Sequence, residues 1–256
     1  MPADLSLSGR HAVVTGASRG IGAAIAARLA EMGALTTLIG RDAEALRREA
    51  SRNKEARVAL CDVTDPAQVE MVFAEACARA PVAILINNAG AVESAPFLKT
   101  TDAMLERLLD VNLLSAFRCA RAALPPMIAV GWGRIVNIAS IAGLRGYPYV
   151  TAYVAAKHAL VGLTRALAME TARQGITVNA VCPGYTDTEL VHNAVATIVS
   201  RTGRSEADAL GELIRNNPQG RLIQPEEVAE TVAWLCSPGA GSITGQAIAV
   251  AGGEIM

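Results

Sequence analysis

The stretch Thr15-Gly16-Ala17-Ser18-Arg19-Gly20-Ile21-Gly22 decides how this chain folds. It directly follows a short apolar run, Ala12-Val13-Val14, which has the length and character of a buried strand. Apolar residues at helical spacing come directly after the turn, and they are Ile21, Ile25, Leu29 and Met32. A glycine-rich turn between a strand and a helix is a position at which phosphate groups bind in many α/β folds.

Three glycines give this turn its properties. Gly16 permits the tight turn, Gly20 lets the backbone approach a pyrophosphate, and Gly22 allows the helix to pack closely on the strand. The helix N-terminus adds free N–H groups and a partial positive charge. The spacing is G-x3-G-x-G rather than G-x-G-x-x-G, and a glycine triplet by itself also occurs in turns that bind nothing.

Strands and helices alternate along the rest of the chain. Further apolar runs with strand character are 35–39, 58–61, 82–86, 134–138, 177–181 and 247–250. Helical spacing lies between them, and Pro125-Pro126 is expected to kink or end the helix that reaches about residue 128. The alternation predicts an α/β fold, a single domain over 1–256 with a Rossmann-like, doubly wound parallel sheet of about seven strands. Ligands bind such sheets at the carboxyl ends of the strands.

The composition excludes several classes of protein. Hydrophobic residues make up 52% of the chain and charged residues 18%, with a net charge of −1 and both signs interspersed. This pattern predicts no nucleic-acid surface and no membrane surface, and no apolar stretch approaches the roughly 18 residues of a membrane span. The first residues, Met1 to Ser6, lack the basic and apolar regions of a signal peptide. The five cysteines form no CxxC pair, so we expect a cytoplasmic protein without a metal site.

Six motifs in order resemble the short-chain dehydrogenase/reductase family over nearly the whole chain. The first is the glycine turn, which looks like Thr-Gly-x-x-x-Gly-x-Gly. The others are Cys61-Asp62-Val63, Asn87-Asn88-Ala89-Gly90, Ser140 after the fifth strand, Tyr153-Val154-Ala155-Ala156-Lys157, and Pro183-Gly184 after the sixth strand. One departure stands near the C-terminus, where Ala251-Gly252-Gly253 replaces the Asp-Gly-Gly of many relatives. This change puts a local hydrogen bond in doubt but leaves the chemistry intact.

Tyr153 and Lys157 are four residues apart and share one face of a helix. A free tyrosine has a pKa near ~10, and a nearby ammonium is expected to lower the pKa of Tyr153. A tyrosine tuned in this way exchanges a proton with a carbonyl or alcohol oxygen. Without the family context, an exposed Tyr–Lys pair with no catalytic role is the favoured explanation, because such pairs are common on helices.

The resemblance implies a hydride transfer with four catalytic residues: Asn112, Ser140, Tyr153 and Lys157. Ser140 and Tyr153 would hold the substrate oxygen, and Tyr153 would supply the proton while hydride passes from C4 of the reduced nicotinamide. Lys157 would bind the nicotinamide ribose. Asn112 would mark a backbone distortion that holds a water joining Lys157 to solvent. The alternative for Ser140 is a strand-end serine that caps a turn, and the alternative for Asn112 is a surface asparagine or a bend in the helix.

The resemblance also implies the residues that hold the dinucleotide. They are Gly16, Ser18, Arg19, Gly20, Ile21, Gly22, Arg41, Asp62, Val63, Asn88, Ala89, Gly90, Tyr153, Lys157, Pro183, Gly184, Thr186 and Thr188. The second strand ends in Gly40-Arg41 where NAD-preferring relatives place an acidic residue, so NADP(H) is favoured over NAD(H). Arg19 is a second cation for a 2′-phosphate, or is simply solvated. Asp42 is expected to cap the next helix, or to accept from a ribose hydroxyl.

The segment 189–217 breaks the alternation and resembles the family's small helical lid over the substrate. By position, the residues expected near the substrate are Ser140, Tyr153, Leu144, Tyr147, Tyr149, Glu93, Tyr185 and His192. Arg201, Arg204 and Arg215 in the lid would meet an anion or be solvated. His11 and His158 are expected to be structural, and no histidine has partners at metal-ligand spacing.

The motifs resemble members of the family that act on 3-oxoacyl or 3-hydroxyacyl thioesters, which is the leading substrate class. The alternative is a reductase or dehydrogenase of a small or cyclic ketone or alcohol. A remote alternative is a non-catalytic dinucleotide sensor, which would not need the four catalytic residues, and a lyase or epimerase of this fold would need a longer C-terminal region. A homotetramer is expected from the family and from helix 151–172, which is apolar on more than one face.

Overall fold

A computed structural model describes residues 6–255 of the chain. Met1 to Leu5, which belong to the segment expected not to be a signal peptide, lie outside the described residues. Seven parallel strands form one sheet in the order β3-β2-β1-β4-β5-β6-β7. Their bounds are β1 His11–Thr15, β2 Leu35–Gly40, β3 Ala56–Leu60, β4 Val82–Asn87, β5 Gly133–Ile138, β6 Ile176–Pro183 and β7 Ala247–Val250. The strand order reverses between β1 and β4, and in such a sheet a crevice for ligands opens at that point.

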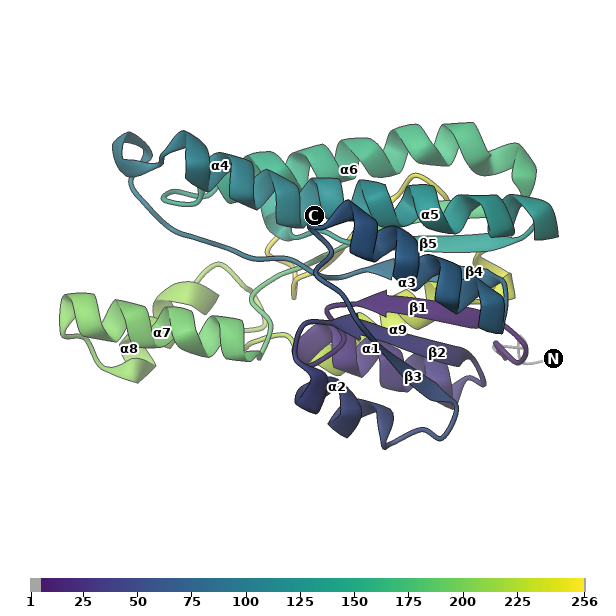
Figure 1. Ribbon diagram of the computed structural model, residues 1–256. Coiled ribbons are helices and arrows are strands. Elements are labelled where there is room, and N and C mark those ends of the chain that lie inside the picture. Colours follow the sequence, from purple (N-terminus) through teal and green to yellow (C-terminus); the bar gives the residue numbers. More distant parts are fainter. Residues whose placement is uncertain (1–5, 256) are drawn as a thin grey trace.

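Helices cover both faces of the sheet (Figure 1). On one side lie α1 Gly20–Glu31, α2 Ala43–Ala50 and α9 Pro225–Cys236. On the other lie α3 Pro66–Arg79, α4 Asp102–Leu109, α5 Ser115–Val130 and α6 Thr151–Thr171. The predicted doubly wound α/β fold is therefore confirmed, and both β4 and β6 are buried along their whole length, as strands between two helical layers should be.

Local capping explains where two of these helices begin. The Asp42 side chain accepts from the Ala45 N–H at 3.0 Å, which confirms its predicted role as a helix cap. Asp65 caps α3 in the same way and is followed by Pro66 at the first helical position. These short-range signals fix the starts of α2 and α3 at the edge of the sheet where ligands bind.

The helical stretch Asp102–Val130 is not one regular α-helix. A π-helical segment, Asp110–Leu114, interrupts it, and Asn112 is buried within that segment. Of the two effects expected at Pro125-Pro126, a kink or an end of the helix, the end is wrong, because α5 continues to Val130. The carbonyl groups that lose their partners belong to Arg121 and Ala122, which are exposed and half-buried, so water can reach them.

By length and composition, the same 29-residue stretch is apolar enough to cross a membrane. The sequence analysis did not expect such a stretch, because it considered only uninterrupted runs of apolar residues. One face of α5 packs on the sheet, where Cys119, Ala123 and Met127 are completely buried. This is the environment of a core helix.

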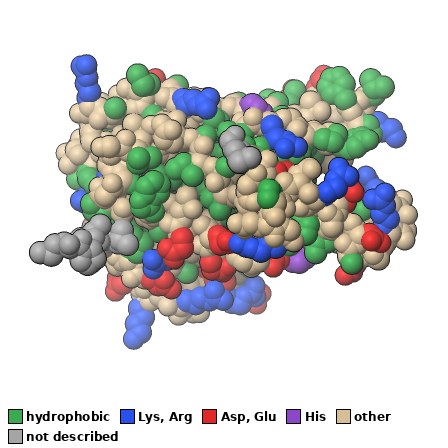
Figure 2. Space-filling view, turned by 180° about the vertical axis from the view of Figure 1, so that it is seen from behind, with side chains coloured by type: hydrophobic (Ala, Val, Ile, Leu, Met, Phe, Trp, Pro, Cys, Tyr) green, Lys and Arg blue, Asp and Glu red, His purple; other side chains and the backbone are tan. Residues whose placement is uncertain are grey.

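Two further helices, α7 Glu189–Thr202 and α8 Glu206–Ile214, project from the carboxyl edge of the sheet. They occupy the predicted lid segment and are the green pair at the left of Figure 1. Seen from behind, the surface carries charged side chains of both signs, interspersed with apolar ones (Figure 2).

Candidate active site

Thr15 and Asn88 join the glycine turn to the exit of β4. The Thr15 hydroxyl accepts from the backbone N–H groups of Asn88 and Ala89, both at 3.0 Å. The Asn88 amide in turn donates to the carbonyls of Thr15 at 3.0 Å and Gly16 at 3.1 Å. Two motifs that are more than seventy residues apart in sequence therefore form one rigid edge at the point where the strand order reverses.

The glycine turn has the shape of a phosphate cradle. A Cβ at Gly22 would collide with the Gly16 carbonyl and the Asn88 amide, so only glycine fits there. Gly16 and Gly20 have φ of +64° and +56°, which favour glycine. Arg19 stands at the N-cap of α1 without any side-chain cap, which leaves the first N–H groups of the helix available to an anion. These features fit the diphosphate of a dinucleotide.

The positions expected at the adenosine end lie next to each other. Asp62 accepts from the backbone and hydroxyl of Thr64 at 3.0 and 2.7 Å, and these bonds lower the pKa of its carboxyl. The Arg41 guanidinium lies 3.6 Å from the other Asp62 oxygen and is 80% exposed. Val63 is buried beside them. Arg41 is thus placed at the end of β2 with most of its donors free to meet a ligand.

Arg19, the second expected cation, is paired with the lid. Its guanidinium contacts the Glu189 carboxylate at 2.6 Å, at the first residue of α7. Beside this pair, a Cβ at Gly20 would lie 3.2 Å from a methyl group of Thr188. The sequence did not predict this contact between the glycine turn and the lid.

The π-helical segment places Asn112 against the exit of β4. Its amide donates to the carbonyls of Ala91 and Leu108, both at 2.9 Å, and its oxygen accepts from the Ala91 N–H at 3.3 Å. A Cβ at Gly90 would lie 2.7 Å from the Asn112 oxygen and 3.6 Å from Lys157 Nζ. The backbone distortion expected at Asn112 is therefore present, and Gly90 separates Asn112 from Lys157.

Ser140, Tyr153 and Lys157 meet at the carboxyl end of β5. Lys157 is buried, its Nζ donates to the Ile138 carbonyl at 2.9 Å, and it lies 5.6 Å from the centre of the Tyr153 ring. Ser140 caps the short helical turn Ile141–Gly143, and its side chain interacts with the Tyr153 hydroxyl. The arrangement can hold an oxygen atom between two hydroxyl groups with a cation behind them.

The expected lowering of the Tyr153 pKa is wrong for this structure. Burial raises the pKa of Tyr153 to about 12, and the interaction with Ser140 opposes this rise only in part. Burial lowers the pKa of Lys157 to about 8. Burial disfavours the charged form of both groups, and at neutral pH Tyr153 therefore carries its proton.

The exit of β6 completes the edge of the site. Pro183 ends the strand, and the Gly184 N–H donates to the Val250 carbonyl at 3.0 Å. The Thr186 hydroxyl donates to the Gly184 carbonyl at 3.0 Å and the Thr188 hydroxyl to the Thr186 carbonyl at 3.2 Å. The chain thus turns tightly from β6 into the lid. Ala251, at the position of the missing aspartate, is buried against Gly184.

The residues expected near the substrate have different surroundings. Leu144 and Tyr185 are half-buried beside the site, and Tyr185 acts electrostatically on Tyr153. The Tyr147 hydroxyl donates to Glu254 at 2.7 Å. Tyr149 is 64% exposed and has φ of +66°, a strained conformation for a non-glycine residue. Its carbonyl accepts from the Ala95 N–H at 2.8 Å and so joins two loops above the site.

Two of the expected substrate contacts are engaged with other side chains, one in an ion pair and one in a hydrogen bond. Glu93 forms a two-pronged pair with Arg107 on α4, at 2.9 and 2.8 Å. His192 lies 2.8 Å from Asp187 on the exposed side of the lid base. His11 is structural as predicted, because its ring nitrogens contact Ala80 O and Thr37 Oγ1, both at 2.8 Å.

Sequence reasoning missed Arg145 and Glu254. The Arg145 guanidinium lies 4.7 Å from the centre of the Tyr147 ring, and Glu254 accepts from the hydroxyl of that same tyrosine. Glu254 is 107 residues from Tyr147 in the sequence. Only the departure from Asp-Gly-Gly pointed to this part of the chain.

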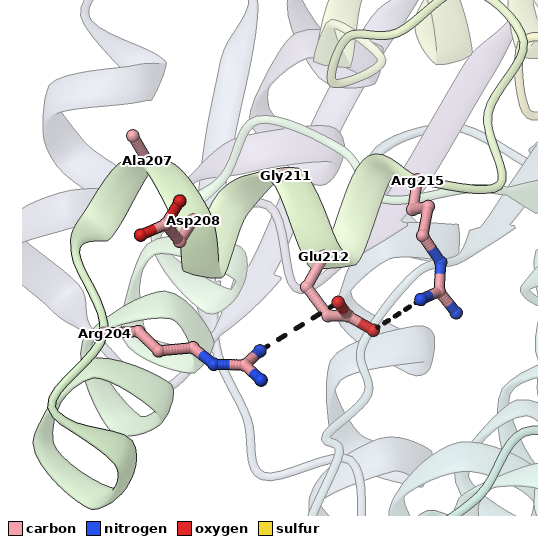
Figure 3. A pocket seen from close by; sticks show the side chains of 6 residues that line it. All are labelled: Arg204, Ala207, Asp208, Gly211, Glu212 and Arg215. Carbon is pink, nitrogen blue, oxygen red and sulfur yellow. Dashed lines mark ion pairs between the residues drawn. The ribbon is translucent and has the colours of Figure 1, made fainter.

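The lid carries an open hollow of about 470 Å³ on α8 (Figure 3). Arg204 and Arg215 both point to Glu212 there, at 4.0 and 3.3 Å. Since the carboxylate lies between the two cations, this arrangement does not support an anion site at the lid arginines. Among residues 6–255, no cluster of three or more metal-ligating side chains is found.

Comparison with known proteins gives a consistent picture. The family model described as enoyl-(acyl carrier protein) reductase matches residues 16–254. The solved structure of a single-substitution variant of an actinorhodin polyketide ketoreductase with NADPH superposes with a TM-score of 0.92 at 38% identity, covering 99% of each chain. A D-beta-hydroxybutyrate dehydrogenase of Rhizobium meliloti is 37% identical over 252 residues, covering 95% of this chain and 98% of its own. A galactitol 2-dehydrogenase of Cereibacter sphaeroides is 39% identical over 251 residues, covering 96% and 95%.

Proposed function

Because the chain belongs to the short-chain dehydrogenase/reductase family and is an oxidoreductase of CH–OH groups that uses a nicotinamide dinucleotide, we propose that it reduces a 3-oxoacyl thioester with NADPH. The observation that carries this proposal is the meeting of Ser140, Tyr153 and Lys157 at the carboxyl end of β5. The likeness to a polyketide ketoreductase and a hydroxybutyrate dehydrogenase supports the acyl class. A small or cyclic ketone or alcohol is the second candidate, supported by the likeness to galactitol 2-dehydrogenase.

The residues of this chain divide the work of the reaction. When bound, the dinucleotide supplies the hydride. The hydroxyls of Ser140 and Tyr153 hold the carbonyl oxygen, and Tyr153, protonated at neutral pH, donates its proton to that oxygen as negative charge develops. The Lys157 ammonium stabilises the phenolate that remains. Asn112 positions the β4 exit against Lys157 through its three hydrogen bonds to Ala91 and Leu108.

The preference for NADP(H) over NAD(H) is supported by Arg41 and Arg19. Arg41 is mostly exposed at the end of β2, and Gly40 stands where a carboxylate on the strand end would repel a 2′-phosphate. The solved relatives with NADPH and NADP are in line with this choice. A homotetramer in the cytoplasm belongs to the same proposal, and the absence of a disulfide among the five cysteines, all of them within residues 6–255, agrees with a reducing compartment.

The test is the initial rate of cofactor oxidation with acetoacetyl-CoA and a panel of small ketones, using NADPH and NADH in parallel. We expect turnover of the thioester with NADPH and a loss of at least about 100-fold in Tyr153→Phe. Arg41→Ala should reduce the preference for NADPH about tenfold. Turnover of other ketones alone would remove the thioester assignment, and tight cofactor binding with no turnover would favour a sensor.

A further inference from the structure

The C-terminal turn Ala251–Glu254 lies among the segments that line the site. At the β6 exit, a Cβ on Gly184 would lie 3.2 Å from the Ala251 Cα. A Cβ on Gly252 would collide with the side chain of Asn217, and one on Gly253 would lie 3.2 Å from Pro218. Because Asn217 is the last residue of the lid segment and Pro218 follows it, the turn packs between the β6 exit and the end of the lid.

Glu254 extends from this turn to the loop that precedes the catalytic tyrosine. Its carboxylate accepts from the Tyr147 hydroxyl at 2.7 Å. Tyr147 lies between Ser140 and Tyr153 in the chain, and Arg145 stacks on its ring at 4.7 Å. Both Glu254 and Tyr147 are half-buried, so the hydrogen bond fixes a negative charge at the wall of the site.

Glu254 has a stronger effect than Arg145 on the tyrosine hydroxyls of this wall. Burial is the main cause of the raised pKa values of Tyr147 and Tyr185, and after it Glu254 raises both values more than Arg145 lowers them. Arg145 is exposed, where water and salt screen its charge. Tyr185 lies close enough to Tyr153 to act on it electrostatically, although burial is the main cause of the raised pKa of Tyr153. The Glu254 carboxylate therefore acts on two tyrosines of this wall, Tyr147 and Tyr185, and Tyr185 neighbours Tyr153.

We propose that Glu254 is a specificity-determining residue that disfavours substrates with a free carboxylate and favours neutral acyl substrates such as esters and thioesters. This inference rests on the ketone reduction proposed above. A 3-oxo acid carries its carboxylate two carbons from the reacting carbonyl, so this second negative charge would enter a half-buried site beside Glu254. An ester or thioester of the same acid brings no such charge. Tyr147 acts as a positioning residue, because it holds the carboxylate in place.

Acetoacetate and ethyl acetoacetate are matched probes, since they share the reacting ketone and differ in charge. We would measure kcat/KM for both with NADPH in the wild type, Glu254→Gln, Tyr147→Phe and the control Glu75→Gln, which removes an exposed carboxylate on α3. Glu254→Gln should raise the ratio of kcat/KM for acetoacetate to that for ethyl acetoacetate about tenfold. Tyr147→Phe should shift the ratio in the same direction by a smaller factor, and Glu75→Gln should leave it unchanged.

A ratio in Glu254→Gln within twofold of the wild-type ratio would overturn the inference while leaving the proposed reaction intact. The melting temperature of each variant shows whether it is folded, and Tyr147→Phe provides the second test should Glu254→Gln be unstable. Full retention of ketone reduction in Tyr153→Phe would overturn the proposed function instead. No reduction of either probe by the wild type would overturn both.

Discussion

Lys157 is a buried cation whose nearest hydrogen-bond acceptor is a neutral carbonyl. It is 4% exposed, donates to the Ile138 carbonyl, and burial lowers its pKa to about 8 from an ordinary value of 10.5. A lowered pKa means that the folded state resists protonation of this side chain. The cost to stability is complete below about pH 8 and disappears as the pH rises towards 10.5.

Replacing Lys157 with methionine should therefore trade activity for stability. At pH 7 we expect Lys157→Met to be about 1–2 kcal/mol more stable than the wild type, after allowance for the lost hydrogen bond. The difference should shrink by about 2 kcal/mol between pH 7 and pH 10. Urea denaturation of both proteins across this range measures it, with reduction of ketones falling at least about 100-fold in parallel. A variant that is less stable at pH 7 would show that the buried ammonium is stabilising.

The residues proposed to be catalytic could be located from the sequence because each one belongs to a short motif at a strand end or on a helix. Their protonation could not be predicted, because it depends on burial and on neighbours that come from other elements. Tyr149 and Glu254 show the same limit. The left-handed backbone of Tyr149 is imposed by its contact with Ala95, and Glu254 reaches Tyr147 across 107 residues.

The turn between β1 and α1 tolerates little change at Gly22. Gly22→Ala would push a methyl group against the Gly16 carbonyl and the Asn88 amide, which belong to the two sides of the cradle. We expect the KM for NADPH to rise at least about tenfold and the melting temperature to fall by several degrees. Gly211→Ala on α8 is the control, because its Cβ would meet nothing within 4 Å. Equal behaviour of the two variants in calorimetry and kinetics would contradict this account.

Glu189, the first residue of the lid helix α7, pairs with Arg19, which is one of the two cations proposed to bind a 2′-phosphate. Glu189 contacts Arg19 at 2.6 Å, and a 2′-phosphate would have to replace that carboxylate to bind the same guanidinium. Glu189→Gln should therefore lower the KM for NADPH about threefold and leave the KM for NADH unchanged. Glu206→Gln, in the first turn of α8, is the matched control. An equal change in both KM values would show that the pair acts only on the lid.

Most elements could be located from the sequence because their periodicity is strong, and the observed bounds of the strands differ from the expected ones by at most two residues. Two exceptions to helix rules do not follow from periodicity, although the family resemblance implies a distortion at Asn112. The π-helical turn at Asn112 follows from its bonds to Ala91 and Leu108, which no local pattern reveals. The helix continues through Pro125 and Pro126 because the carbonyls that they leave unpaired, those of Arg121 and Ala122, lie on the side of the helix that solvent can reach.

At the scale of the whole molecule, the parallel sheet and its two helical layers follow from the alternation of strands and helices, whereas the order of the strands comes from the structure. The assembly does not follow in the same way. Helix α6 is apolar on several faces, yet only some of these residues are buried: Ala152 and Val161 are, while Ala155 is exposed. Which apolar residues stay exposed on a single chain, and could therefore form a subunit interface, can be told only from the folded structure.

Exposed apolar residues gather on α5 and the segment before it. Leu114, Phe117, Ile128 and Val130 are 41%, 46%, 45% and 52% exposed, and the first three lie on one stripe of the helix. Burial of such a stripe against a second copy would remove its apolar surface from water, which favours the proposed homotetramer. Light scattering should then give a mass close to four times the 26.6 kDa of one chain.

Phe117→Glu places a charge in the middle of this stripe and should split the assembly into smaller species, because an unpaired charge is costly to bury in an apolar interface. Met71→Glu is the control, since Met71 is 53% exposed on α3 and lies outside the stripe. If Phe117→Glu keeps the mass of the wild type, then subunits associate through another surface. If the wild type has the mass of one chain, the proposed tetramer is wrong. The stripe would then be a solvent-exposed face of a monomer.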